Sequence, residues 1–337
     1  MSVHATLAQS WRGKLHAALT RGSQVSTSSD QFIPAVITDH MTLPEVIAIL
    51  VQNSCPNVTR ELDLASCSTQ PLARGAFNDI YRGTLLDGSL VAIKTPRLYL
   101  KIERFALTAR GVYAWSKCNH PNILPFIGLA ELHGEPTTVS PWMGNGSIRD
   151  YVNKQPGADR FNLCTQIACG LAYLHSIGIV HSNFEGSNIL VSDLGVPVIG
   201  GFGNSTPGES TIHFAQMKDD ASVSVRWAAP ELLQGLPGTS STAADVYALG
   251  MATETGRQEV FTGKIPYYYI EHDIRMLAAV VIQREVPQRP LEHIPPNDGQ
   301  GDMLWTLMKN CWRYEPEERP TTDHVYKTMK PFVIDSG

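Results

Sequence analysis

The polar decapeptide at residues 181–190 is the stretch of this sequence with the clearest chemical potential. It reads HSNFEGSNIL and follows an apolar, helix-like run. His181 and Asn188 stand at its two ends, with Asn183 and Glu185 between them. Such residues could take part in proton transfer or metal binding, although an amide like that of Asn183 cannot act as a base. The stretch is therefore either a catalytic loop that has lost part of its chemistry or an ordinary turn that resembles one.

Two kinds of element surround this loop. Residues 71–100 alternate apolar and polar residues on both sides of Asp87 and Gly88, a strong two-residue turn signal, and this predicts consecutive antiparallel strands. After about residue 144 the pattern becomes helical. The helical stretches are residues 159–176, 242–262, 272–283 and 302–313. The sequence therefore predicts an α+β fold, with a small sheet-rich part followed by a large helical part.

The chain before the sheet divides into two segments. Residues 1–38 are rich in Ser, Thr and Ala and are predicted to form a flexible arm. A basic start without acidic residues can also be a mitochondrial presequence, but we expect a cytoplasmic protein. Residues 39–67 are predicted to be a helical segment, because Thr42 and Pro44 precede apolar residues at helical intervals.

The composition excludes several classes of function. A net charge of −5 gives no support for nucleic acid or an anionic membrane as a partner. The six cysteines form no CxxC pair, so they indicate reduced thiols rather than a zinc site or a disulfide framework. No apolar run approaches the roughly 20 residues that span a bilayer. With 43% hydrophobic and 18% charged residues, the chain has the composition of a packed globular protein.

Five motifs follow one another in a fixed order along the chain. They are VAIK at 91–94, HPNIL at 120–124, AAPELL at 228–233, DVYALG at 245–250 and CWRYEPEERPT at 311–321. In this order the chain resembles a protein kinase over residues 68–334. It looks most like the tyrosine-kinase-like group, in a fungal-looking form with the loop spacing of serine/threonine kinases. The resemblance implies a two-lobed fold, with an antiparallel-sheet N-lobe carrying one helix at 68–142 and a helical C-lobe at 144–334.

Three charged residues match the structural anchors of that family. The resemblance implies a buried ion pair between Glu231 of the APE run and Arg319 of ERP. It also implies that Asp245, at the start of the next helix, holds the backbone of the loop at 181–190. These residues support folding and say nothing about catalysis.

The resemblance places a nucleotide site in and after the N-lobe. Gly75 is the one glycine left where the family reads GxGxxG, and Lys94 is the lysine that contacts the α- and β-phosphates. The family's glutamate partner of this lysine falls on Gly111, and Glu103 could replace it only with a shifted helix register. The residues expected around an adenine are Ile80, Ala92, Pro141, Met143 and Leu190, with Ser140 as the gatekeeper. Ordinary core packing explains Ile80, Ala92 and Leu190 equally well.

The same resemblance makes the decapeptide the catalytic loop, which reads HRDLKxxN in the family. Asn183 replaces the catalytic aspartate, Glu185 replaces the loop lysine, and His181 is retained. Asn188 would be the only remaining metal ligand, because Gly201 replaces the magnesium-binding aspartate of DFG. We therefore expect ATP binding to be weak and largely independent of magnesium, and we expect no structural metal. The double change of Glu185 to Lys and Gly201 to Asp is expected to make ATP binding magnesium-dependent.

Three functions stay open from the sequence. The first is a pseudokinase that acts as an adaptor or allosteric regulator of other signalling proteins, an active kinase among them. The second is an active protein kinase that transfers the ATP γ-phosphate to a protein hydroxyl and uses substitute ligands such as Asp219 or Asp220. The third is an interaction module that needs no nucleotide. About four extra residues near 253–257 are either an insertion in the central helix or a gene-model artefact.

Overall fold

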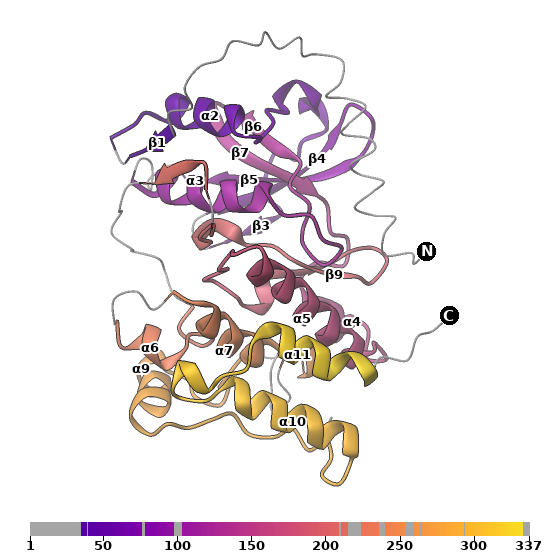
Figure 1. Ribbon diagram of the computed structural model, residues 1–337. Coiled ribbons are helices and arrows are strands. Elements are labelled where there is room, and N and C mark those ends of the chain that lie inside the picture. The colour runs from indigo at the N-terminus through magenta and orange to yellow at the C-terminus, as the bar shows by residue number, and fades with distance from the viewer. Residues whose placement is uncertain are drawn as a thin grey trace. The chain divides into compact units, whose positions relative to one another are not determined.

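The computed structural model describes most of the chain and divides it into two compact units (Figure 1). The described residues are 35–38, 40–75, 78–97, 103–208, 210–214, 224–235, 240–253, 259–262, 265–292 and 294–332. Among the described residues, the first unit takes those from Ala35 to Trp142 together with residues 210–214, and the second takes the rest. Residues 210–214, which come after the first part of the second unit in the sequence, therefore belong to the first unit.

The first unit is built on an antiparallel sheet with the strand order β2-β4-β5-β7-β6, and β3 pairs with β4. Its elements are β1 (Ala35–Ile37), α2 (Leu43–Gln52), β2 (Leu62–Asp63), β3 (Ala73–Arg74), β4 (Asn78–Leu85), β5 (Leu90–Pro96), α3 (Glu103–Ser116), β6 (Gly128–Leu132), β7 (Glu135–Pro141) and β10 (Ile212–Phe214), with short 3-10 turns at Thr59–Glu61 and Leu64–Ser66.

The hairpin of β4 and β5 forms where the sequence predicts it. Gly88 has a φ of 82°, a left-handed conformation that glycine adopts without steric cost. Val91 and Ile93 on β5 are both 0% exposed, and they pack into one core with residues of β6 and β7. Since side chains alternate along a strand, the residues between them face the other side of the sheet.

The N-terminal part of this unit differs from the prediction in two places. Residues 1–34 lie outside the described residues, but Ala35–Ile37, which were assigned to the flexible arm, form strand β1. Helix α2 begins after Thr42, whose backbone N–H donates to the Glu45 carboxylate over 2.8 Å in a capping box. It ends at Gln52, so the predicted helical segment is only partly helical.

The second unit is mainly helical. Its elements are α4 (Ile148–Lys154), α5 (Arg160–Ser176), β8 (Ile189–Val191), β9 (Pro197–Ile199), α6 (Pro230–Leu233), α7 (Thr242–Thr253), α8 (Glu259–Thr262), α9 (Asp273–Leu277), a π-helical turn (Ala278–Ile282), α10 (Gly299–Cys311) and α11 (Thr322–Met329), with 3-10 turns at Gly186–Asn188, Phe202–Asn204, Pro316–Glu318 and Lys330–Phe332.

The predicted helices of this unit are present, with shifted boundaries. Helix α5 begins after Asp159, whose carboxylate accepts the backbone N–H of Asn162 over 3.0 Å. The stretch predicted at 272–283 is α9 followed by the π-helical turn. Residues 254–258, which hold most of the predicted insertion near 253–257, lie outside the described residues. Within the described part of the chain, no helix combines the length and the apolar character that crossing a bilayer requires.

Candidate functional site

Three of the predicted nucleotide residues share one face of the sheet in the first unit. Ile80 of β4 lies opposite Lys94 of β5, and Ala92 lies two residues before Lys94. Directly opposed residues in an antiparallel pair point to the same side, and so do residues two apart on one strand. Ser140 of β7 lies opposite Ala92 and joins this face. All four residues turn away from the core side that Val91 occupies.

The other predicted nucleotide residues lie at separate places. Gly75 donates its N–H to the Asn78 carbonyl over 2.8 Å, just before residues 76 and 77, which lie outside the described residues. Pro141 ends β7 and is buried opposite Val91. Met143 and Leu190 belong to the second unit, where Leu190 is a half-buried residue of β8. Each unit thus carries part of the predicted set.

Helix α3 contains the position where the family has a glutamate. Gly111 is buried within α3, so this position of the helix carries no carboxylate. Glu103 is the first residue of the same helix, two turns earlier, and its side chain lies outside the described residues.

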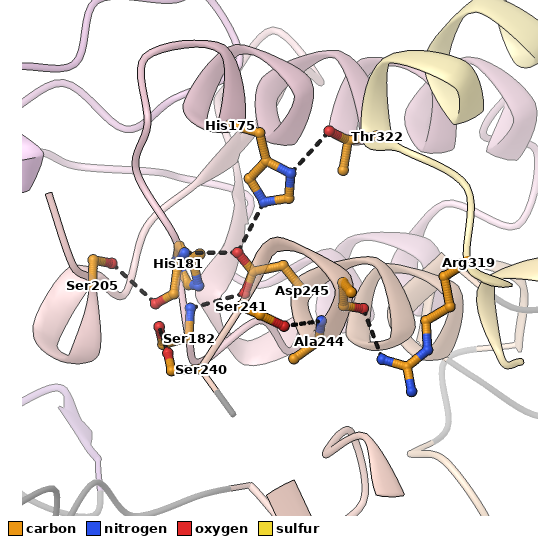
Figure 2. Close-up of polar contacts among 11 residues, drawn as sticks. His175, His181, Ser182, Ser205, Ser240, Ser241, Ala244, Asp245, Arg319 and Thr322 are labelled. Atoms are coloured by element: carbon orange, nitrogen blue, oxygen red, sulfur yellow. Dashed lines mark hydrogen bonds and ion pairs between the residues drawn. The ribbon is translucent and has the colours of Figure 1, made fainter. Parts of the chain in front are cut away.

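The loop at 181–190 is held in place by Asp245, as predicted (Figure 2). The backbone N–H of His181 donates to Oδ2 of Asp245 over 2.7 Å, and that of Ser182 donates to Oδ1 over 2.9 Å. Asp245 is 2% exposed, so both hydrogen bonds lie away from water. Ser182 has a left-handed backbone with a φ of 63°, which is costly for a residue other than glycine. The two hydrogen bonds to the Asp245 carboxylate stabilise this conformation.

His181 lies inside the unit and cannot reach a substrate. Its side chain is 0% exposed, and Nε2 donates to the carbonyl of Gly200 over 2.8 Å. Burial lowers the pKa of His181, because protonation would place an unpartnered N–H at the buried Nδ1. The rings of Phe184 and Phe202 pack on it edge to face, with centroids 5.6 and 5.4 Å away. His181 therefore positions Gly200, the residue before Gly201.

A second histidine in this network was not predicted from the sequence. His175 of α5 bonds through Nε2 to Oδ2 of Asp245 over 3.0 Å and through Nδ1 to the hydroxyl of Thr322 over 3.0 Å (Figure 2). Ser205, which is 0% exposed, donates to the His181 carbonyl over 3.0 Å. A histidine within an apolar helical run was the available signal for His175, since a buried polar side chain needs partners.

The two altered residues Asn183 and Glu185 and the retained Asn188 bond within the loop and to its neighbours. The Asn188 amide donates through Nδ2 to the carbonyl of Asn183 over 2.9 Å. Oδ1 of Asn183 accepts a hydrogen bond from the hydroxyl of Ser224 over 3.3 Å. The Glu185 carboxylate accepts from the hydroxyl of Ser187. The loop keeps its backbone shape without the aspartate and lysine of the family sequence.

Gly201 lies against the amide of Asn188, the one metal ligand expected at this loop. It has a φ of 80°, and a Cβ added there would lie 2.2 Å from Cγ and 2.3 Å from Oδ1 of Asn188. The Asn188 amide thus fills the space of a side chain at 201, and it offers one neutral oxygen where magnesium prefers carboxylates. Among the described residues, no group of three or more His, Cys, Asp or Glu residues is placed to hold a metal ion.

The same geometry adds a condition to one expectation from the sequence. An aspartate at position 201 would have to adopt a left-handed backbone and displace Asn188, the other ligand that it was expected to assist. The double change at Glu185 and Gly201 can therefore restore a magnesium site only if the Asn188 side chain moves aside.

The fold and the anchors define a protein kinase domain. The profile of the protein tyrosine and serine/threonine kinase family matches residues 67–329, which is more than half of the chain. The chain belongs to this family, and it has the family's two-lobed fold of an antiparallel-sheet lobe and a helical lobe.

The most similar relatives include kinases of both specificities. The chain is 27% identical over 279 residues to the serine/threonine-protein kinase STY46 of Arabidopsis thaliana, covering 79% of this chain and 44% of the relative. It is 26% identical over 288 residues to STY17 of the same plant, covering 82% and 46%. It is 28% identical over 284 residues to the proto-oncogene tyrosine-protein kinase ROS of Mus musculus, covering 77% and 12%. The chain spans less than half the length of these relatives.

Proposed function

We propose that this protein is a catalytically impaired member of the kinase family, a pseudokinase that acts in the cytoplasm as an adaptor or allosteric regulator. Its proposed partners are other signalling proteins, an active kinase among them. The observation that carries the proposal is the arrangement of Asn183, Asn188 and Gly201. The resemblance puts Asn183 at the position of the base, and the Asn188 amide occupies the space that a Cβ at position 201 would take.

Phosphoryl transfer depends on positioning and charge stabilisation, so each missing group has a separate cost. Loss of a general base lowers the rate by about 10² to 10⁴. Loss of a metal ion removes several kcal/mol of transition-state stabilisation. These costs need not multiply, but they act on a usual turnover of about 1 to 100 per second. Little phosphotransfer should remain.

Nucleotide binding is proposed to be weak and largely independent of magnesium. Ile80, Ala92 and Lys94 share a sheet face that suits an adenine and its first phosphates. The second unit adds no carboxylate at position 201 and places Glu185 where the family has a cation. Affinity should therefore fall with each added phosphate, and adenosine should bind at least as tightly as ATP.

The test uses the full chain in two separate assays. The first follows phosphate incorporation from ATP with magnesium or manganese into the chain itself and into generic peptides, with Lys94→Ala as the control. No incorporation above the Lys94→Ala level is expected. The second is calorimetry with adenosine and with ATP, each with and without magnesium. Stoichiometric incorporation that disappears in Lys94→Ala would overturn the proposal, as would tight, magnesium-dependent binding of ATP.

The alternative is an active protein kinase that transfers the ATP γ-phosphate to a protein hydroxyl. The names of the relatives favour it, because they are serine/threonine and tyrosine kinases. It requires substitute metal ligands, for which the sequence offers Asp219 and Asp220. If the parent incorporates phosphate, the variant Asp219→Asn/Asp220→Asn should lose that activity.

A further inference from the structure

Residues 210–214 come shortly after the sequence Gly201-Phe202-Gly203. They pair with the N-terminal end of the described chain. Strand β10 pairs in parallel with β1, so that Ala35 lies opposite Ile212 and Ile37 lies opposite Phe214. The two strands form a sheet of their own. Two parallel strands of three residues each are not stable through backbone hydrogen bonds alone, because parallel sheets normally depend on buried faces. Side chains must supply the stability.

A buried core joins the two strands to helices α2 and α3. Ile37 is 0% exposed and Ile212 is 1% exposed, and both belong to one hydrophobic cluster. The cluster also contains Leu50 of α2 together with Ala109 and Tyr113 of α3. Phe214 packs against the Tyr113 ring, with the ring centroids 6.1 Å apart. Segments that are distant in the sequence therefore share one core.

Hydrogen bonds also connect these segments to one another. The hydroxyl of Thr211 donates to Oδ1 of Asn53, the residue that follows α2, over 3.2 Å. Because a threonine hydroxyl has one proton, the Tyr113 hydroxyl is then the donor in its 3.0 Å bond to Thr211. Lys117 donates to the Asn53 carbonyl over 3.2 Å, and its ammonium lies 4.6 Å from the Tyr113 ring centre. Thr211 thus connects α2 to α3.

From these contacts we infer that residues 35–53 act as an internal clasp, which stores residues 210–214 on the first unit and fixes helix α3 at the same time. Opening the clasp releases both elements together. Gly111, at the position of the family's glutamate, lies two residues from Tyr113 on the same helix. A partner or a protease that acts on residues 35–53 would therefore change the positions of residues 210–214 and of helix α3. These are the two segments whose positions matter most in this family. No chemistry at residues 181–190 would be needed.

Hydrogen–deuterium exchange on the full chain tests the clasp with a matched pair of variants on one strand. Ile37→Ser places a polar group in the shared core, whereas Val36→Ser changes a neighbour that is 48% exposed. In Ile37→Ser we expect the amides of residues 210–214 and 109–113 to exchange at least about tenfold faster, and to do so together. Val36→Ser should leave both segments unchanged.

Two further measurements distinguish opening of the clasp from unfolding of the protein. Strand β5 and helix α5 should keep the protection of the parent in Ile37→Ser. Thr211→Val, which keeps the side-chain shape and removes the hydroxyl, should raise exchange in the same two segments to a smaller extent. The inference is overturned if Ile37→Ser leaves residues 210–214 protected, if β5 loses protection along with them, or if the two segments open independently. None of these outcomes depends on phosphotransfer.

Discussion

The guanidinium of Arg319 meets the carboxylate of Glu231 through two parallel hydrogen bonds. Nη1 donates to Oε1 over 2.6 Å, and Nη2 donates to Oε2 over 2.7 Å. The Arg319 side chain is 0% exposed, and its other donors reach the carbonyls of Ala243, Arg313 and Tyr314. All five N–H groups of the buried guanidinium are therefore satisfied. This confirms the ion pair that the sequence predicts.

Replacing Arg319 should destabilise the second unit strongly. Arg319→Ala leaves the Glu231 carboxylate without its partner and frees three carbonyls, so the expected loss in the free energy of unfolding is about 3 to 5 kcal/mol. Arg313→Ala is the control, because Arg313 is 57% exposed and its Nη1 lies 4.0 Å from Glu318. Urea unfolding of the two variants should differ clearly, and equal midpoints would contradict this account.

Asp245→Asn should loosen the loop at 181–190. The Asp245 carboxylate accepts hydrogen bonds from the backbone N–H groups of His181 and Ser182 and bonds to the His175 ring. An amide offers one acceptor oxygen and turns N–H protons toward at least one donor, which costs about 1 to 3 kcal/mol for each buried group left unsatisfied. Asp323→Asn is the exposed control, since Asp323 is 61% exposed. A similar melting temperature for both variants would rule out the role of Asp245.

Gly201→Ala tests the packing that excludes a side chain at this position. The left-handed backbone and the contact with the Asn188 amide should together cost about 1 to 3 kcal/mol. Gly203→Ala is the matched control, because an added Cβ there meets nothing within 4 Å. For the same reason, Glu185→Lys with Gly201→Asp should lose stability, and it should gain magnesium-dependent ATP binding only if Asn188 moves aside. Calorimetry that showed such binding would mean that Asn188 can move aside.

Buried histidines should make the fold sensitive to mild acid. Burial lowers the pKa of His120 from 6.5 to about 4. The unfolded chain therefore takes up the proton first, so stability that is present above pH 6.5 is lost as the pH falls toward 4. Burial also lowers the pKa of His181, and this acts in the same direction.

A single variant isolates the contribution of His120. His120→Asn can keep an acceptor for the Asn122 N–H, which His120 Nδ1 receives over 3.1 Å, but it does not titrate in this range. Between pH 7.5 and pH 5, the urea midpoint of the parent should fall further than that of His120→Asn. His324→Asn changes an exposed histidine and should follow the parent. Parallel curves for the parent and His120→Asn would disprove the effect.

Features that follow from local spacing or from motif order were predictable, and pairings between segments without a motif were not. The hairpin at Gly88 and the anchors Glu231, Asp245 and Arg319 follow from turn chemistry or from motif order. The pairing of β1 with β10 joins segments with no common pattern, and Ala35–Ile37 were assigned to the arm. The filling of the Gly201 space by Asn188 depends on a backbone angle that residue types alone do not reveal.

The pairing of β1 with β10 also imposes an order on biosynthesis. Ile37 is made 175 residues before Ile212, since 212 minus 37 is 175. At 5 to 20 residues per second, this is a delay of about 9 to 35 s. Until then the surface formed by Leu50 and Tyr113 lacks its last covering strand, although the rest of the first unit up to Trp142 has already been made. A nascent chain halted before residue 212 should therefore bind chaperones that recognise apolar surface, and one halted beyond residue 214 should not bind them through this surface.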